Sequence, residues 1–301
     1  MRAVAEAKPD RLFLACDGAH PSRTAEIELV EATRRAMEDA VTWPCAVERL
    51  YHETNQGCRK GVVSAIDWFF SNVEAGIILE DDCVPHPDFF PYCAELLSRY
   101  ATTPEVMHIS GDGGLAALSG DRIESYVFTQ EVLVWGWATW RRAWNCYDRD
   151  LKRWGEMREN QTAVQALFGF EKATAYWTRI LDRLLIENLP DTWDYQWTFT
   201  VRERNGVAIV PTRNLITNVG YRGDATHTTS EKGPRSNVQS DALGEIMHPS
   251  RVEIDEELDR AIQSELRGFH AAKRKKSKWR RLRRRIRSIF KILLSLRTIN
   301  P

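Results

Sequence analysis

Short apolar runs alternate with helix-period stripes along the first 110 residues, and this alternation limits the fold more than any other feature. Apolar runs of strand length occupy residues 11–16, 46–51, 75–79 and 106–110. Between them apolar side chains recur at spacings of three and four, most clearly at Val62, Val63, Ile66, Phe69, Phe70 and Val73. Strands that alternate with helices are typical of a parallel sheet covered on both faces. We therefore predict an α/β fold with a mostly parallel central sheet and flanking helices.

Acidic side chains stand where the predicted strands end. Asp17 follows the first run, Glu80-Asp81-Asp82 follows the third directly, and Asp112 follows the fourth. Ligands of such sheets bind outside the carboxyl ends of the strands. Consecutive carboxylates repel one another unless a cation neutralises them, and Mg²⁺ and Mn²⁺ bind carboxylate oxygens while keeping positions open for phosphate. The pattern predicts a divalent metal site here, the alternative being a solvated turn of acids.

Eight of the eleven tryptophans lie between residues 135 and 197. Aromatic side chains in such numbers usually build a core. The sequence Trp135-Gly136-Trp137 also suits a ligand platform, because glycine lets the backbone approach a ligand closely. We assign Trp137 to ligand contact and the other tryptophans to the core.

The C-terminal segment differs sharply in charge from the rest of the chain. Thirteen of the 42 Lys and Arg residues and no Asp or Glu lie in residues 273–301, so the remainder carries a net negative charge. Apolar residues of this segment share one helical face, which predicts a basic amphipathic helix. Such a helix suits an anionic membrane surface, and nucleic acid is the competing partner that the apolar face disfavours. We predict a domain over residues 1–250 and a helical extension over residues 251–301.

Several motifs in a fixed order carry a resemblance to a known family. They are Ala15-Cys16-Asp17-Gly18, Leu79-Glu80-Asp81-Asp82-Cys83-Val84-Pro85, His108-Ile109-Ser110-Gly111-Asp112, Val134-Trp135-Gly136-Trp137, Asp191-Thr192-Trp193-Asp194-Tyr195-Gln196-Trp197 and Asn218-Val219-Gly220. The set resembles the glycosyltransferases of the GT-A (nucleotide-diphospho-sugar transferase) fold, in particular a bacterial family-2-like, haemolysin-related group. The acidic motif is also similar to that of the N-acetylglucosaminyltransferase that initiates complex N-glycans.

The resemblance implies a hexosyl- or N-acetylhexosaminyltransferase that moves a sugar, with inversion, from a nucleotide-diphosphate donor to a glycan or lipid-linked acceptor hydroxyl. It implies that Asp82 binds a Mn²⁺ or Mg²⁺ ion at the donor diphosphate, and that Glu80 and Asp81 face the nucleoside. Asp17 and Arg23 would hold the base and ribose. Asp112 is counted among the donor-binding residues.

Asp194 is the candidate catalytic base and Asp191 the second candidate. The acceptor hydroxyl needs a carboxylate to take its proton, and partial desolvation between Trp193 and Trp197 would raise the basicity of Asp194. The N-glycan enzyme has adjacent acids between its tryptophans, where this chain has Asp194-Tyr195-Gln196. The alternative is that Asp194 caps a helix beginning near Tyr195.

A further strand is predicted for the apolar run at residues 207–211, and the polar loop after it offers two further candidates. His227 suits a Mn²⁺ ligand, although a lone histidine also packs or forms hydrogen bonds without any metal. Arg222 suits the donor diphosphate, because guanidinium pairs well with phosphate.

Two alternative functions share this fold. A sugar-nucleotide nucleotidyltransferase would need a Gly-rich, Lys-bearing loop after the first strand, and residues 16–23 lack it. A membrane-tethered, non-catalytic binding module would keep the fold without the chemistry. The N-terminus has too short an apolar run for a signal peptide or a membrane span, so we expect a cytoplasmic protein, peripheral on the inner face of the cell membrane.

Overall fold

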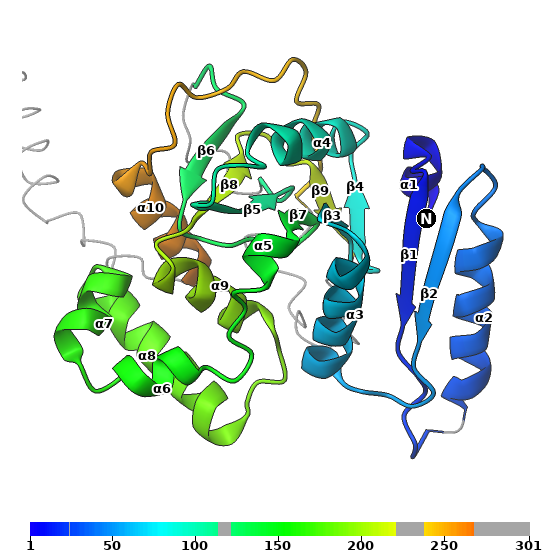
Figure 1. The fold of residues 1–301 in the computed structure, drawn as a ribbon, viewed down its shortest axis with the longest axis horizontal. Coiled ribbons are helices and arrows are strands. Elements are labelled where there is room, and N and C mark those ends of the chain that lie inside the picture. The colour runs from blue at the N-terminus through cyan, green and yellow to red at the C-terminus, as the bar shows by residue number, and fades with distance from the viewer. Residues whose placement is uncertain (24, 114–121, 221–237, 268–301) are drawn as a thin grey trace, which may run out of the picture. The chain divides into compact units, whose positions relative to one another are not determined.

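A computed structural model describes residues 1–23, 25–113, 122–220 and 238–267. The chain divides into two compact units, Met1–Ile262 and Gln263–Pro301, and all the strands of the described residues belong to the first (Figure 1). The described elements are, in order, α1 Arg2–Ala7, β1 Arg11–Cys16, α2 Glu26–Asp39, β2 Ala46–Tyr51, α3 Cys58–Asn72, β3 Ala75–Ile78, β4 Cys83–Pro85, α4 Phe89–Arg99, β5 Val106–Ser110, β6 Tyr126–Thr129, β7 Trp137–Trp140, α5 Arg141–Trp144, α6 Lys152–Met157, α7 Gln161–Phe168, α8 Glu171–Glu187, α9 Asp194–Glu203, β8 Val207–Pro211, β9 Ile216–Asn218 and α10 Glu256–Arg267.

The strands form three separate sheets in the described part of the chain. Five strands make the central sheet in the order β3-β7-β5-β8-β6, while β1 pairs with β2 and β4 pairs with β9. In the central sheet only β5 and β8 run parallel, and the pairs β3–β7, β5–β7 and β6–β8 are antiparallel. The strands β1 and β2 run parallel over six residue pairs.

The α/β class is confirmed, but the prediction of a mostly parallel sheet is wrong. The first four apolar runs predicted as strands do form β1, β2, β3 and β5. The sheet is mixed because β7 lies between β3 and β5 and runs antiparallel to both, while β6 adds an antiparallel strand outside β8. Both strands come from the aromatic region that the sequence pattern did not resolve into strands.

Side chains of the central sheet alternate between two core clusters, one on each face. Val207 and Ile209 of β8 join a cluster with Phe89, Tyr92 and Leu96 of α4. The intervening Ala208 joins the opposite cluster, which contains apolar side chains of α3, α5 and α9. This two-residue alternation is the strand periodicity expected for a sheet buried on both faces.

Residues beyond the predicted boundary at 250 belong to the first compact unit. Ile254 forms a parallel β-bridge with Phe128, and Ile262 on α10 is 1% exposed. The unit therefore ends at Ile262 because this segment packs its apolar side chains onto the sheet domain. The predicted basic amphipathic helix lies outside the described residues. Within the described residues, no helix is both long enough and apolar enough to cross a bilayer.

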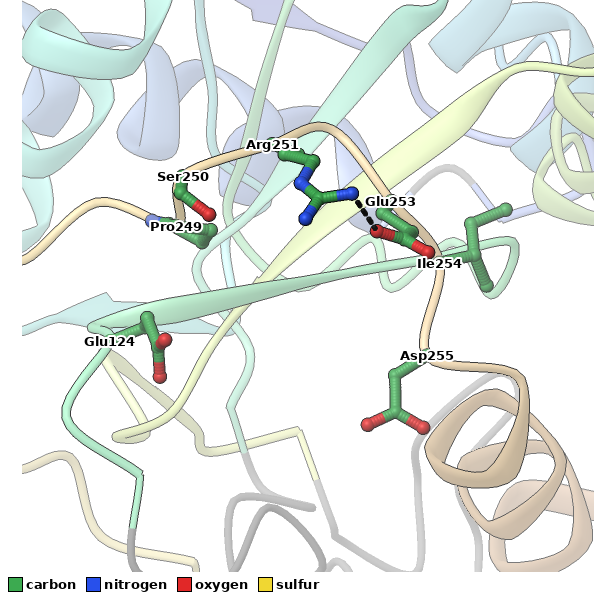
Figure 2. Close-up of a pocket in the computed structure, with 7 residues that line it drawn as sticks. All are labelled: Glu124, Pro249, Ser250, Arg251, Glu253, Ile254 and Asp255. Carbon is green, nitrogen blue, oxygen red and sulfur yellow. Dashed lines mark ion pairs between the residues drawn. The ribbon is translucent and has the colours of Figure 1, made fainter.

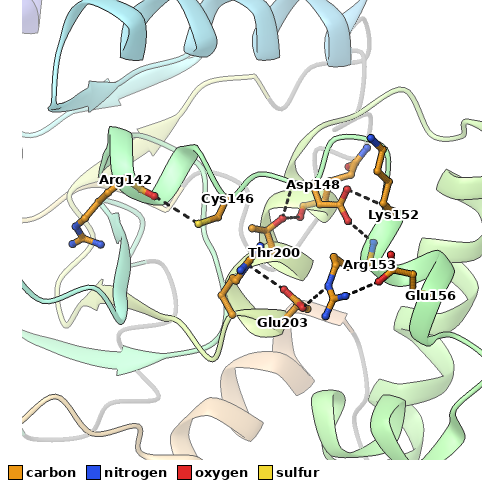
Figure 3. Close-up of polar contacts among 10 residues, drawn as sticks. Arg142, Cys146, Asp148, Lys152, Arg153, Glu156, Thr200 and Glu203 are labelled. Carbon is orange, nitrogen blue, oxygen red and sulfur yellow. Dashed lines mark hydrogen bonds and ion pairs between the residues drawn. The ribbon is translucent and has the colours of Figure 1, made fainter.

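Helix α9 is tied to the neighbouring helical layer by polar contacts (Figure 3). The backbone N–H of Asp148 donates to Oγ1 of Thr200 at 3.1 Å, and the Asp148 carboxylate accepts the N–H groups of Lys152 and Arg153 at the start of α6. Nε of Arg153 donates to Glu203 at 2.9 Å. These bonds fix the C-terminal half of α9 against α6 and the turn before it.

A buried ion cluster also holds the C-terminal end of α9. Arg202 is 2% exposed and its guanidinium donates to the fully buried Glu131 carboxylate. The same guanidinium lies 3.8 Å from a carboxylate oxygen of Asp259 on α10, which accepts the Thr129 hydroxyl at 2.5 Å. Burial raises the pKa of Asp259 because it disfavours the charged form. The cluster joins α9, α10 and the β6–β7 connection in one desolvated site.

Replacing Arg202 with Met should destabilise the protein strongly. The change keeps most of the side-chain volume but removes the cation beside the buried Glu131 carboxylate, so we expect the free energy of unfolding to fall by about 3–5 kcal/mol in urea denaturation. The double change Arg202→Met with Glu131→Leu should recover much of this loss, because it also removes the buried anion.

Arg204→Met is the matched control, because Arg204 pairs with Glu203 at 3.3 Å on the surface and its side chain is 51% exposed. We expect it to change the free energy of unfolding by less than about 1 kcal/mol. Equal losses in the two single variants would contradict a special role for the buried cluster.

Candidate functional site

The backbone of the acidic trio is held between strands. β3 ends at Ile78, and the N–H of Cys83 donates to the carbonyl of Glu80 at 3.1 Å, which closes a turn around the trio. Directly after the turn, β4 pairs antiparallel with β9, so that Cys83 lies opposite Asn218. The carbonyl of Asp82 accepts the N–H of Val219 at 2.8 Å. The three carboxylates therefore project from a fixed turn.

The end of β9 packs closely on Asp82. A side-chain carbon added at Gly220 would clash with Oδ2 of Asp82 and lie 3.0 Å from its Cβ. On the other side, the Cys83 thiol donates to Oδ1 of Asp82 at 3.4 Å. The carboxylate of Asp82 is thus confined by its neighbours, and only glycine fits at position 220.

Glu80 lies in a strongly negative environment. Burial, followed by the negative charges of Asp82, Asp194 and Asp81, raises the pKa of Glu80 to about 8. Asp194 belongs to α9, so two segments more than a hundred residues apart bring their carboxylates to one place. Among the ion pairs of the described residues, none involves any of these four acids.

Two other predicted acids bind the beginning of α3. Both carboxylate oxygens of Asp17 accept the N–H of Gln56 at 2.9 Å. The carboxylate of Asp191 accepts the N–H of Cys58 at 2.9 Å and that of Arg59 at 3.3 Å. The first N–H groups of a helix have no partners within it and carry its positive end, so Asp191 satisfies those of α3. Asp17 instead fixes the loop just before the helix.

Asp194 is the first residue of α9 and does not act as its cap. Trp193 occupies the cap position without a side-chain hydrogen bond, and the Asp194 carboxylate accepts the Thr192 hydroxyl. Burial and the charges of Glu80, Asp191 and Asp194 raise the pKa of Cys58 to about 12. The thiol of Cys58 thus lies among the trio, the 191–194 loop and the start of α3, which ties these segments to one site.

The remaining predicted residues stand apart from this site or outside the described chain. Arg23 is 68% exposed in its side chain and pairs with Glu26 at 3.0 Å. Asp112 is buried after β5, and its backbone N–H donates to Oγ of Ser110 at 3.0 Å. Arg222 and His227 lie outside the described residues.

Trp137 differs from its predicted role as a ligand platform. It is fully buried, stacked on Trp193 with ring centroids 5.4 Å apart and on His108 at 5.0 Å. The reason is the strand alternation of β7, which sends Trp137 into the α3–α9 face of the sheet. The indole therefore belongs to the core that supports α9.

The sequence analysis did not single out Cys58, Thr192 or Gly220. Cys58 carries no local signal, because its relation to the acids depends on the packing of α3. Gly220 did fall within a motif of the resemblance, but its contact partner Asp82 lies 138 positions earlier.

A metal at this site would need ligands beyond the side chains described. No group of three or more His, Cys, Asp or Glu side chains in the described ranges is placed to hold a metal ion. A surface pocket elsewhere contains none of the predicted residues (Figure 2); it is lined by Glu124, Pro249, Ser250, Arg251, Glu253, Ile254 and Asp255. The acidic turn is therefore the candidate site on grounds of charge and convergence.

Comparison with protein-family models finds no match to this chain, and comparison with curated proteins finds none either.

The pH dependence of stability should report the environment of Glu80. With a pKa of about 8 in the folded protein against 4.5 ordinarily, Glu80 keeps a proton that the unfolded chain loses between these values. The free energy of unfolding should therefore fall as pH rises from about 4.5 to 8 and level off above. Glu80→Gln removes this titration, so the variant should gain on the order of 1–3 kcal/mol relative to the parent between pH 5 and pH 8.

The measurement is urea denaturation across this pH range in the presence of a chelator, with Asp150→Asn, an exposed carboxylate, as the control. The control should follow the parent protein at every pH. Parallel profiles for the parent and Glu80→Gln would show that Glu80 ionises as it does in an unfolded chain.

Proposed function

We propose that this protein is a metal-dependent glycosyltransferase that moves a sugar from a nucleoside-diphosphate donor to an acceptor hydroxyl. The observation that carries the proposal is the convergence of Glu80, Asp81, Asp82 and Asp194 without an ion-pair partner among the described residues. Concentrated like charge is costly unless a ligand compensates it. The ordered motifs that resemble GT-A glycosyltransferases support the same function.

A hard divalent cation fits the chemistry of these residues. Carboxylate oxygens are the ligands that Mg²⁺ and Mn²⁺ prefer, and Mg²⁺ usually keeps waters and phosphate oxygens in most of its coordination positions. The limited set of protein ligands therefore suits a cation that is shared with a diphosphate. Asp82 would hold the ion, which neutralises charge on the departing diphosphate. Glu80 and Asp81 would face the nucleoside.

The residues around Asp194 suit a base. In the transfer, the bond between the sugar C1 and the diphosphate oxygen breaks, and the diphosphate leaves with the electron pair. The acceptor oxygen forms the new bond to C1 and gives its proton to the Asp194 carboxylate. A single displacement of this kind inverts the configuration at C1. Asp191 is less suited to this role, because its carboxylate is occupied by the start of α3.

The acceptor would be a glycan or a lipid-linked hydroxyl. The composition of residues 273–301, which are basic and carry apolar side chains at helical spacing, supports a lipid surface as the place of reaction. This localisation is part of the proposal.

Nucleotide binding tests the proposal directly. In a thermal-shift screen with Mn²⁺, one nucleoside diphosphate should raise the unfolding midpoint, by an amount that corresponds to about 2.7 kcal/mol at a hundredfold excess over Kd. Asp82→Ala should remove the Mn²⁺-dependent part of this response. Asp194→Asn should keep the response and lower the transfer rate by about 10²–10⁴-fold.

Asp150→Ala is the control for loss of an acidic side chain, and it should behave as the parent protein in both assays. If no nucleoside diphosphate stabilises the parent protein in the presence of Mn²⁺, the proposed function is wrong. If Asp194→Asn transfers sugar at the parental rate, the base is another residue.

A further inference from the structure

Asn218, the last residue of β9, has a buried side-chain amide in which the oxygen accepts a hydrogen bond and the nitrogen makes none among the described residues. The residue is 6% exposed. Its Oδ1 accepts the N–H of Gly220 at 2.7 Å. Its Nδ2 is buried and makes no hydrogen bond in the structure as described. A buried donor without an acceptor costs free energy, so a folded chain rarely keeps one without a use for it.

The turn that this amide closes adjoins Asp82. Asn218 is opposite Cys83 in the β4–β9 pair, and the next N–H along the chain, that of Val219, donates to the carbonyl of Asp82 at 2.8 Å. The bond from Gly220 to Oδ1 of Asn218 closes a turn that brings Gly220 against the Asp82 side chain. The turn that the Asn218 amide closes therefore packs against the Asp82 side chain.

The turn requires the carbonyl oxygen of the Asn218 side chain but not its NH2 group. Asparagine and aspartate side chains both accept a backbone N–H two residues further on, so an aspartate would close the same turn. The N–H groups are what distinguish asparagine from aspartate here, and the described residues offer them no acceptor. They suit a ligand rich in oxygen acceptors.

We propose that Asn218 is a ligand-binding residue whose Nδ2 donates to a phosphate oxygen of a nucleoside diphosphate bound beside Asp82. The inference rests on the proposed function and adds a residue to its donor site. A neutral donor suits this position, because it binds a phosphate oxygen without forming an ion pair with Asp82 that would compete with a cation.

Two variants separate the turn from the ligand contact. Asn218→Asp keeps an oxygen for the N–H of Gly220 and loses the donor, while Asn218→Ser keeps a neutral acceptor on a shorter side chain. Asn218→Ser should retain the parental unfolding midpoint within a few degrees in the absence of ligand, whereas Asn218→Asp should lower it, because it buries a carboxylate next to the acidic turn. Both should bind the nucleoside diphosphate found in the Mn²⁺ screen about tenfold to a hundredfold more weakly by calorimetry.

Val219→Asp is the control for added charge, because Val219 is 42% exposed and adjoins the same turn. It should weaken binding less than Asn218→Asp does. Titration with Mn²⁺ alone should give the same response in Asn218→Ser as in the parent protein, which shows that the metal site is intact.

Parental affinity in both Asn218 variants would overturn the inference and leave the proposed function standing. Equal losses in Val219→Asp and Asn218→Asp, with parental affinity in Asn218→Ser, would also overturn it and assign the effect to charge. If the parent protein binds no nucleoside diphosphate, the proposed function fails first and this inference fails with it.

Discussion

Repulsion among carboxylates is the constraint around which this end of the molecule is built. Burial is the strongest effect that raises the pKa of Glu80, and the nearby charges of Asp82, Asp194 and Asp81 act in the same direction. Such a group of acids would move apart if the chain allowed it. The turn from Glu80 to Cys83 and the pairing of β4 with β9 prevent this, because hydrogen bonds fix the backbone on both sides of the trio. The fold therefore supplies the free energy that keeps the charges together.

The acids of the site divide into two groups by what satisfies them. Asp191 accepts the first N–H groups of α3, at the positive end of that helix, and Asp17 accepts the N–H groups of Gly18 and Gln56. Among the described residues, Glu80 and Asp82 accept no backbone N–H group with their carboxylates, and the Asp194 carboxylate, in the first turn of α9, accepts the Thr192 hydroxyl. In the proposed site, the first group stabilises the local structure, and the charge of the second group would be compensated by a bound cation. This division also explains why Asp191, three positions before Asp194, carries a different role.

Local periodicity predicted β1, β2, β3, β5 and β8 and the helices between them. A buried strand or an amphipathic helix requires apolar residues at fixed spacings, which can be recognised in a short stretch of sequence. The order of the sheet was not predictable in this way. β6 and β7 are four-residue strands in an aromatic region, and their antiparallel insertion depends on partners far along the chain. Trp137 shows the limit clearly: the neighbouring glycine suggested an exposed ring, while the strand alternation that buries it appears only with β7 in place. The acids at the strand ends were found because a charge after an apolar run is a local signal.

Helix α9 connects the core to the chemistry. The charge of its first residue, Asp194, acts on Glu80 in the acidic turn, and Arg202, two turns later, forms the buried ion cluster with Glu131. A helix held at its far end by desolvated charges and along its side by contacts to α6 cannot easily rotate or slide. The position of the Asp194 carboxylate is then determined by the core rather than by a flexible loop. Precise placement of a base depends on this kind of support, because small displacements of a reacting group are costly.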